Sequence, residues 1–293
     1  MANLKDIKTR INSVKTTRQV TSAMKMVSAA KLKKAHDNVS HIHPYVNKMS
    51  QIIYDLINST SEEINTELTT HREPDNVLIV AIASNRGLCG AFNSNVVKKT
   101  EELIKNSFSA QYQNNVLTIV AIGKQAEKML NQHGYKVKYN FNDYFDNPSF
   151  DAAARIAESF MKDFISKKFD RVIIVYNEFI NAVNQVIRTE QLLPLEMPVN
   201  KDDLKYHDYI FEPKIDSIVK TLIPEALKTL FYKMLLDSVA SEHGARMTSM
   251  HKATDNATDL INDLELEYNK ARQGAITKEI LEIVSGAEAL KST

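Results

Sequence analysis

The sequence contains few of the residues that build disulfide, zinc or membrane-spanning structure. It has one cysteine, Cys89, and no tryptophan in 293 residues. A single cysteine cannot form an internal disulfide or a cysteine-rich zinc site, which is typical of proteins in a reducing compartment. No apolar run approaches the roughly 18 residues that indicate a membrane-spanning helix. The sequence therefore predicts a cytosolic chain that is soluble or peripheral to a membrane.

The chain also lacks an excess of charge of either sign. Lysine and arginine number 37 against 36 acids, so bulk charge gives no reason to bind nucleic acid or membrane. Between Met1 and His36, however, there are nine basic residues and one acid. This basic stripe is either a solvated helix face or a surface that meets an acidic protein or nucleic acid. The same segment is rich in serine and threonine, as mitochondrial transit peptides are.

Glycine is absent before Gly87, which permits a long N-terminal helix. An apolar stripe at heptad spacing supports it, formed by Leu4, Ile7, Ile11 and Val14. The stripe then resumes one residue out of register, which predicts a local change of supercoil, at Val20, Met24 and Val27. We expect Pro44 to kink or end this helix.

After Pro213 the sequence again predicts one long helix. Heptad spacing runs without a break through Ala240, His243, Met247, Met250, Thr254, Ala257, Ile261, Leu264, Tyr268, Ala271 and Ala275. Such a helix would measure roughly 110 Å, whereas a compact chain of this length has a radius of gyration of about 19 Å. We therefore expect the two terminal helices to project and to pair antiparallel. The small residues among these positions either allow close helix approach or leave a pair that needs outside support.

The middle of the chain has the pattern of an α/β layer. Buried-strand runs begin at Val77, Val116 and Arg171, and helical stretches lie between them, which predicts a mainly parallel sheet. The segment 182–193 would add an edge strand. The predicted domains are an N-terminal helix at 1–59, an α/β domain at 72–200 and a C-terminal helix at 206–293.

The glycine-containing segment from Ser84 to Asn93, SNRGLCGAFN, follows the first strand, where α/β proteins often bind ligands. It has neither GxGxxG nor GxxxxGK[ST], so a tight turn is favoured over a nucleotide-dependent enzyme. Cys89 is interpreted as a small packed residue. Three histidines lie close in sequence without metal-site spacing and are interpreted as surface residues, namely His36, His41 and His43. No catalytic constellation is evident, so we expect no cofactor, no metal and no catalysis by the chain alone.

Three segments carry a resemblance to a known family: IKTRINSVKTTRQVTSAMKMVSAAKLKKA, SNRGLCGAFN, and the run from SEHGARMTSM to IVSGAEAL. They resemble the gamma subunit of bacterial F-type ATP synthases. The resemblance implies an antiparallel coiled coil of the terminal helices with an inserted Rossmann-like α/β domain. It further implies a noncatalytic rotor that turns inside a ring of alpha and beta subunits and couples a proton gradient to ATP synthesis. The implied partners are those subunits, the epsilon subunit and the membrane c-subunit ring, without nucleic acid or direct membrane insertion.

The resemblance also implies roles for individual residues. Contact with the beta subunit is implied for Met24, Lys25, Arg246, Arg272, Gln273, Thr277 and Glu279. Contact with the membrane ring or epsilon is implied for Tyr209, Phe211 and Glu212. The family's shaft begins almost at residue 1 of this sequence, so a bacterial protein at the cytoplasmic face of the inner membrane is expected instead of a transit peptide.

The sequence departs from the family pattern at two positions. Asn85 replaces the usual Asp, and Gly274 stands where Ala is common, which weakens that helical turn by about 1 kcal/mol. No inserted cysteine pair is present, so thiol regulation is not expected. The alternative function is a coiled-coil tether or nucleic-acid clamp that carries a noncatalytic α/β domain.

Overall fold

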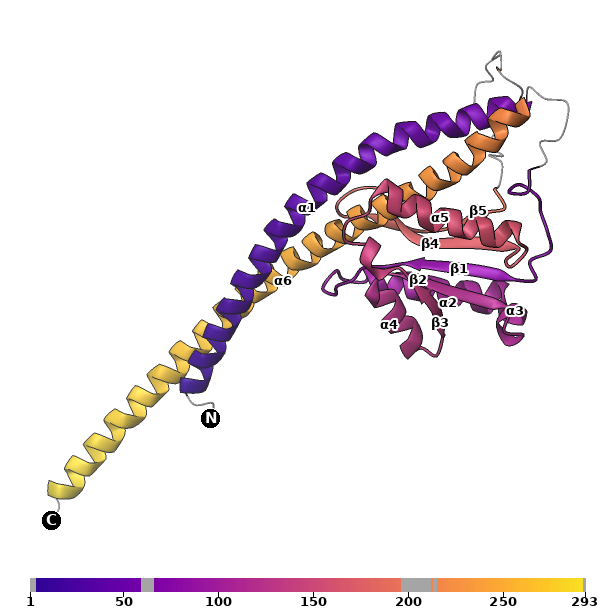
Figure 1. The fold of residues 1–293 in the computed structure, drawn as a ribbon. Coiled ribbons are helices and arrows are strands. Elements are labelled where there is room, and N and C mark those ends of the chain that lie inside the picture. The colour runs from indigo at the N-terminus through magenta and orange to yellow at the C-terminus, as the bar shows by residue number, and fades with distance from the viewer. Residues whose placement is uncertain (1–3, 59–65, 196–211, 213–214, 292–293) are drawn as a thin grey trace. The chain divides into compact units, whose positions relative to one another are not determined.

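A computed structural model describes residues 4–58, 66–195, 212 and 215–291 (Figure 1). The chain divides into two compact units, one formed by Met1–Val27 and Met247–Thr293 and the other by Ser28–Arg246. The long helices α1 (Leu4–Asn58) and α6 (Ile215–Lys291) each contribute to both units. The domain boundaries predicted from the sequence stay a prediction.

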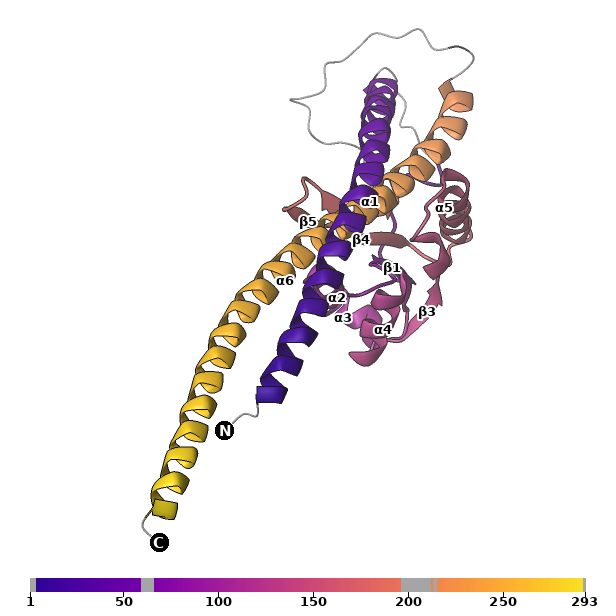
Figure 2. The same cartoon turned by 90° about the vertical axis from the view of Figure 1, so that its left-hand side faces the viewer.

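In the first unit the two terminal helices pair antiparallel, as Figure 2 shows. Ile7 and Ile11 pack against Leu264. Further along α1, Lys15 Nζ lies 2.8 Å from Glu265 Oε1. Thr254 Oγ1 donates a hydrogen bond of 2.9 Å to Thr21 Oγ1. Because residue numbers fall along α6 as they rise along α1, the predicted antiparallel pairing is confirmed.

The predicted shift of register in α1 is wrong. Val20 and Val27, which were assigned to the contact stripe, are 53% and 57% exposed. Heptad spacing continues instead through buried or partly buried positions, at Ile7, Ile11, Val14, Arg18, Thr21, Lys25, Ser28, Leu32, Ala35 and Val39. Arginine and lysine can occupy such positions because their aliphatic stems cover apolar surface while their charged ends reach water. Met24 is partly buried, as expected for a residue beside this stripe.

The heptad pattern of α6 is confirmed in the first unit as far as Ala271 and is wrong at Ala275. Met250, Ala257, Ile261 and Leu264 are buried. From residue 272 to residue 287 every side chain is exposed. The described part of α1 begins at Leu4, whose neighbours Ile7 and Ile11 already pack at the level of Leu264 and Ala271. The last turns of α6 therefore extend beyond the described length of the paired helix.

The second unit contains a five-stranded sheet. Its strands are β1 (Val77–Ile82), β2 (Leu117–Ile122), β3 (Val137–Asn140), β4 (Arg171–Phe179) and β5 (Gln185–Leu193). The strand order is β3-β2-β1-β4-β5, in which only β5 is antiparallel to its neighbour. The connecting helices are α2 (Phe92–Ser107), α3 (Ser109–Gln113), α4 (Lys124–Gln132), the 3-10 turn η1 (Asn142–Tyr144) and α5 (Phe150–Ile165). The predicted mainly parallel sheet and its edge strand are confirmed, and the structure shows that this edge strand, β5, runs antiparallel to β4.

The continuous apolar run of β1 is explained by its central place in the sheet. All six residues of this strand are buried. Residues Val77, Ile79 and Ala81 share one core with α2 and α4, and Figure 1 shows α5 on the opposite face. There Phe160 of α5 meets Phe231 of α6 edge to face, with ring centroids 5.8 Å apart. Burial of one such side chain contributes about 1.5–3 kcal/mol, so this contact attaches α6 firmly to the α/β layer.

Both terminal helices contain an internal proline in the second unit. Pro44 lies within α1 and Pro224 within α6, and neither helix ends there. Burial of the flanking apolar positions explains this continuity, since Val39 and Met49 on α1 and Ile223 and Leu227 on α6 are all buried. In the described ranges of the chain, no helix has the length and apolar character needed to cross a membrane.

Candidate functional site: the turn after strand β1 and its clamp on helix α6

The segment from Ser84 to Asn93 forms a closed turn at the carboxyl end of β1. The Ser84 backbone N–H and its hydroxyl both donate to Asn93 Oδ1 at 2.9 Å. Asn93 Nδ2 in turn donates to the Arg86 carbonyl oxygen at 3.3 Å. Leu88 and Gly90 adopt left-handed φ angles of 64° and 60°. The expected tight turn is therefore present, and Asn93 closes it from the first turn of α2.

Asn85 gives a structural reason for one departure from the family pattern. Its Oδ1 accepts a hydrogen bond of 3.0 Å from the Lys124 backbone N–H at the start of α4. Its Nδ2 donates to the Asn142 carbonyl oxygen at 2.9 Å. An ionised carboxylate has no hydrogen to donate, so the asparagine links the turn to η1 in a way that an aspartate could not.

Arg246 of α6 holds this turn from the other side. Arg246 is buried, with an exposed fraction of 8%. Nη2 donates to the carbonyl oxygens of Arg86 at 3.3 Å and Gly87 at 3.1 Å. Nη1 donates to Glu242 Oε1 at 2.6 Å, one helical turn earlier. The guanidinium thus joins the turn to α6 and neutralises a buried carboxylate.

This geometry argues against the nucleotide-dependent enzyme. A phosphate loop directs backbone N–H groups toward its ligand, whereas the Arg86 and Gly87 carbonyl oxygens direct their lone pairs toward a guanidinium of the same chain. Arg246 also occupies the region next to the carboxyl ends of the strands, where α/β folds of this kind place ligands. The turn is therefore a structural element that α6 covers.

Burial dominates the electrostatics around the clamp. It raises the pKa of Glu242, while the Arg246 charge works in the opposite direction. Burial likewise raises the pKa of the Cys89 thiol, and the thiol is 2% exposed. His243 has a pKa lowered to about 4, chiefly by burial and then by the charges of Arg246 and Lys31. Cys89 is therefore a protonated packed residue at neutral pH, as the sequence predicted.

The residues expected to contact beta occupy different environments. Met24 and Lys25 are partly buried on α1 in the first unit, and Arg246 is buried in the second. Four others are exposed on the last turns of α6, namely Arg272, Gln273, Thr277 and Glu279. Thr277 Oγ1 donates to the Gln273 carbonyl oxygen at 2.9 Å, which leaves its oxygen able to accept. Glu212 is exposed, whereas Tyr209 and Phe211 lie outside the described residues.

Sequence reasoning missed two features. Glu242 pairs with Arg246 at the i, i+4 spacing that favours such pairs on a helix, so this partner was visible in the sequence. Large apolar side chains are exposed near the end of α6, at Ile276, Ile280, Leu281, Ile283 and Val284. The spacing of Ile276, Ile280 and Ile283 continues a helical stripe and was the signal for this face.

The three histidines do not form one site. His36 meets Phe179 edge to face, and His43 pairs with Asp237. His36 and His41 are exposed, and the side chain of His43 is 35% exposed, so the interpretation as surface residues holds. Among the residues that the structure describes, no group of histidine, cysteine or acidic side chains could hold a metal ion.

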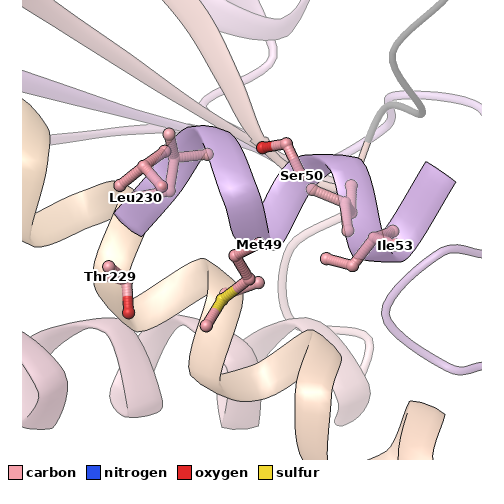
Figure 3. Close-up of a pocket in the computed structure, with 8 residues that line it drawn as sticks. Met49, Ser50, Ile53, Thr229 and Leu230 are labelled. Atoms are coloured by element: carbon pink, nitrogen blue, oxygen red, sulfur yellow. The ribbon is translucent and has the colours of Figure 1, made fainter. Parts of the chain in front are cut away.

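An apolar pocket of about 160 Å³ lies between α1 and α6 in the second unit (Figure 3). Met49, Ser50 and Ile53 of α1 line it opposite Thr229 and Leu230 of α6. Its labelled walls carry two hydroxyl groups and no ionisable side chain. It therefore offers no acid–base chemistry.

A family model described as ATP synthase matches residues 3–290. A protein from Flavobacterium johnsoniae named ATP synthase gamma chain is 52% identical over 290 residues, which cover 99% of each chain. Proteins of the same name from Cytophaga hutchinsonii and Chlorobaculum tepidum are 46% and 40% identical, and the matches cover at least 99% of each chain.

Solved structures agree with these relatives. The central stalk and c-ring structure of the Tetrahymena thermophila mitochondrial ATP synthase contains a chain that matches with a TM-score of 0.57 and 26% identity, over 80% of this chain and 99% of that one. A rotor chain of the Euglena gracilis enzyme shares the fold, with a TM-score of 0.68 and 20% identity over 93% and 98% of the two chains. The chain therefore belongs to the family of ATP synthase gamma chains.

Proposed function

We propose that this chain is the central stalk of an F-type ATP synthase. It transmits torque between the ion-translocating membrane ring and the catalytic alpha/beta hexamer, and so couples a proton gradient to ATP synthesis. It is a noncatalytic subunit, and its partners are alpha, beta, epsilon and the c-subunit ring. The family gives no support to the tether or nucleic-acid clamp.

The end of α6 carries this proposal. Residues 272–287 extend as a single exposed helix, which at 1.5 Å per residue measures roughly 24 Å. Ile276, Ile280 and Ile283 form an apolar stripe on it, and their exposed fractions are 48%, 54% and 66%. An isolated helix of this length is marginal in water and gains stability by packing its apolar face. A surrounding ring of subunits would supply that packing.

The polar residues on the same helical turns are suited to reversible polar contacts with the beta subunit. Arg272 and Glu279 offer charges, and Gln273 and Thr277 offer neutral donors and acceptors, all on exposed positions. Exposed polar groups exchange water for protein partners with little desolvation cost, so such contacts can form and break as a shaft turns.

For the contact with the beta subunit, the burial pattern divides the proposed residues. Met24 and Lys25 are partly accessible and are proposed to touch beta directly. Arg246 is bonded to Glu242 and to the turn after β1, so its proposed effect on beta is indirect. It acts by fixing the turn on which Leu88 is exposed.

The contacts proposed for the membrane side of the stalk follow from the resemblance to the family. Tyr209, Phe211 and Glu212 are proposed to contact the c-ring or epsilon. The bacterial relatives support a peripheral position at the cytoplasmic face of the inner membrane.

Site-specific crosslinking in the purified complex tests the placement of the α6 end. A cysteine introduced by Thr277→Cys is exposed, whereas the native Cys89 is buried and reacts slowly with a thiol-linked photoprobe. The probe at 277 should crosslink to alpha or beta and block ATP hydrolysis. The matched variant Glu102→Cys, on the exposed face of α2, should be labelled without that block. If the 277 probe fails to capture either subunit, the proposed placement is wrong.

A further inference from the structure

A buried carboxylate joins the two long helices in the second unit. Asp237 of α6 is fully buried, with an exposed fraction of 0%. Its Oδ1 lies 3.2 Å from Nε2 of His43, which is on α1 and 194 residues away in sequence. Lys233, one turn earlier on α6, places its Nζ 3.5 Å from Oδ2. The His43 side chain remains 35% exposed, so water reaches the imidazole but not the carboxylate.

The polar pair lies among apolar side chains. Asp237 is flanked by buried apolar side chains on α6, namely Met234, Leu235, Leu236 and Val239. Apolar contacts at heptad spacing are similar when one helix slides by a turn, whereas a single polar pair is satisfied in only one register. Burial of an ion pair adds little net stability, and its best-attested use is to specify register or to act as a switch.

We propose that His43 and Asp237 form a proton-dependent latch between α1 and α6 in the second unit. A neutral imidazole can donate one hydrogen bond from Nε2 to the carboxylate, while a protonated imidazole adds a positive charge to that bond. The latch is tight in the protonated state of His43 and loose in the neutral state. This property goes beyond the role of the chain as a stalk.

The other charged groups that face Asp237 set the limits of this latch. Burial is the main cause that raises the pKa of Asp237, and the Lys233 and His43 charges lower it. Glu178 of β4 raises it further, and Tyr176 of the same strand faces Asp237 as a neutral phenol. At acidic pH, protonation of the carboxyl removes its charge and weakens the latch.

A double-mutant cycle on the full chain tests the latch. Urea unfolding of the wild type, His43→Gln, Asp237→Asn and the double variant gives the coupling between the two positions. At about pH 6 the coupling should be about tenfold in the unfolding equilibrium constant, as for a hydrogen bond between charged groups. At about pH 8.5 it should fall to about twofold, because a neutral imidazole donates only an uncharged hydrogen bond.

His41→Gln is the matched control, since His41 is exposed on the same helix. Combined with Asp237→Asn it should show no coupling at either pH. A coupling between positions 43 and 237 that is absent, or equal at both pH values, overturns the proposal. If Asp237→Asn does not fold, the pH profiles of wild type and His43→Gln decide, and profiles that coincide overturn it as well.

Discussion

Replacing Arg246 by alanine should destabilise the second unit more than any other single change at the clamp. The substitution removes hydrogen bonds to the Arg86 and Gly87 carbonyl oxygens and leaves the Glu242 carboxylate buried without its partner. Breaking a buried ion pair from one side costs about 3–5 kcal/mol. Whole domains have free energies of unfolding of only about 5–15 kcal/mol, so urea unfolding of the full chain should show a large shift of the midpoint.

The loss of stability in Arg246→Ala should depend on the Glu242 charge, which the substitution leaves without a partner. In the double variant Arg246→Met with Glu242→Gln, no buried charge remains at the clamp, so the loss of stability should be smaller than in Arg246→Ala alone, by about 1–3 kcal/mol. Equal losses in the two variants would show that the carboxylate is not the cause.

Cys89 offers an independent measurement because it is the chain's one cysteine and is buried within the turn. In Arg246→Ala a thiol reagent should react with Cys89 faster than in the wild type. The Arg246 charge lowers the pKa of this thiol, so loss of the charge by itself would reduce the thiolate fraction and slow the reaction. A faster reaction therefore reports opening of the turn. A rate that stays the same or falls, together with a stability loss below about 1 kcal/mol, refutes the clamp.

Three further predictions concern other parts of the chain. Met24→Lys should lower proton pumping per ATP hydrolysed more than it lowers assembly; unchanged pumping in vesicles counts against its contact with beta. The pKa of His243 is lowered to about 4 in the folded chain, so between about pH 6.5 and 4 the unfolded chain binds a proton that the folded chain does not. The free energy of unfolding therefore falls as the pH falls through this range. In His243→Gln this fall, measured by urea unfolding, should be smaller by up to about 3 kcal/mol. Gly123→Ala should destabilise the chain by more than about 2 kcal/mol, because the added Cβ would lie 1.9 Å from the Ala83 carbonyl oxygen and the residue has a φ of 100°. Gly274→Ala should stabilise the chain by about 1 kcal/mol, because its Cβ would meet open space within a helix. Thermal unfolding that ranks the two variants in the opposite order contradicts this prediction.

Local patterns predicted the parts of the fold in which one segment determines its own structure. The run VLIVAI is apolar throughout because β1 is central and covered on both faces, and this is visible in the sequence. The heptads of α6 were equally clear as far as Ala271. The prediction failed at Ala275 because burial there requires a partner, and the described α1 does not extend that far.

Other features depend on residues that are distant in sequence. Arg18 and Lys25 occupy contact positions of α1 because long side chains can lie along an apolar surface, whereas a hydrophobicity pattern assigns Val20 instead. Two of the partners of Arg246 are backbone carbonyl oxygens about 160 residues away, which no side-chain pattern reveals. The pairing of His43 with Asp237 is hidden for the same reason.

Rotation is the most direct test of the central claim. A bead attached through Glu102→Cys, an exposed position on α2, would report the motion of the chain in an immobilised alpha/beta complex. The stalk function predicts continuous rotation in one direction when ATP is added and none without it. ATP hydrolysis by a complex that contains the labelled chain, with the bead stationary or moving in both directions at random, would contradict it.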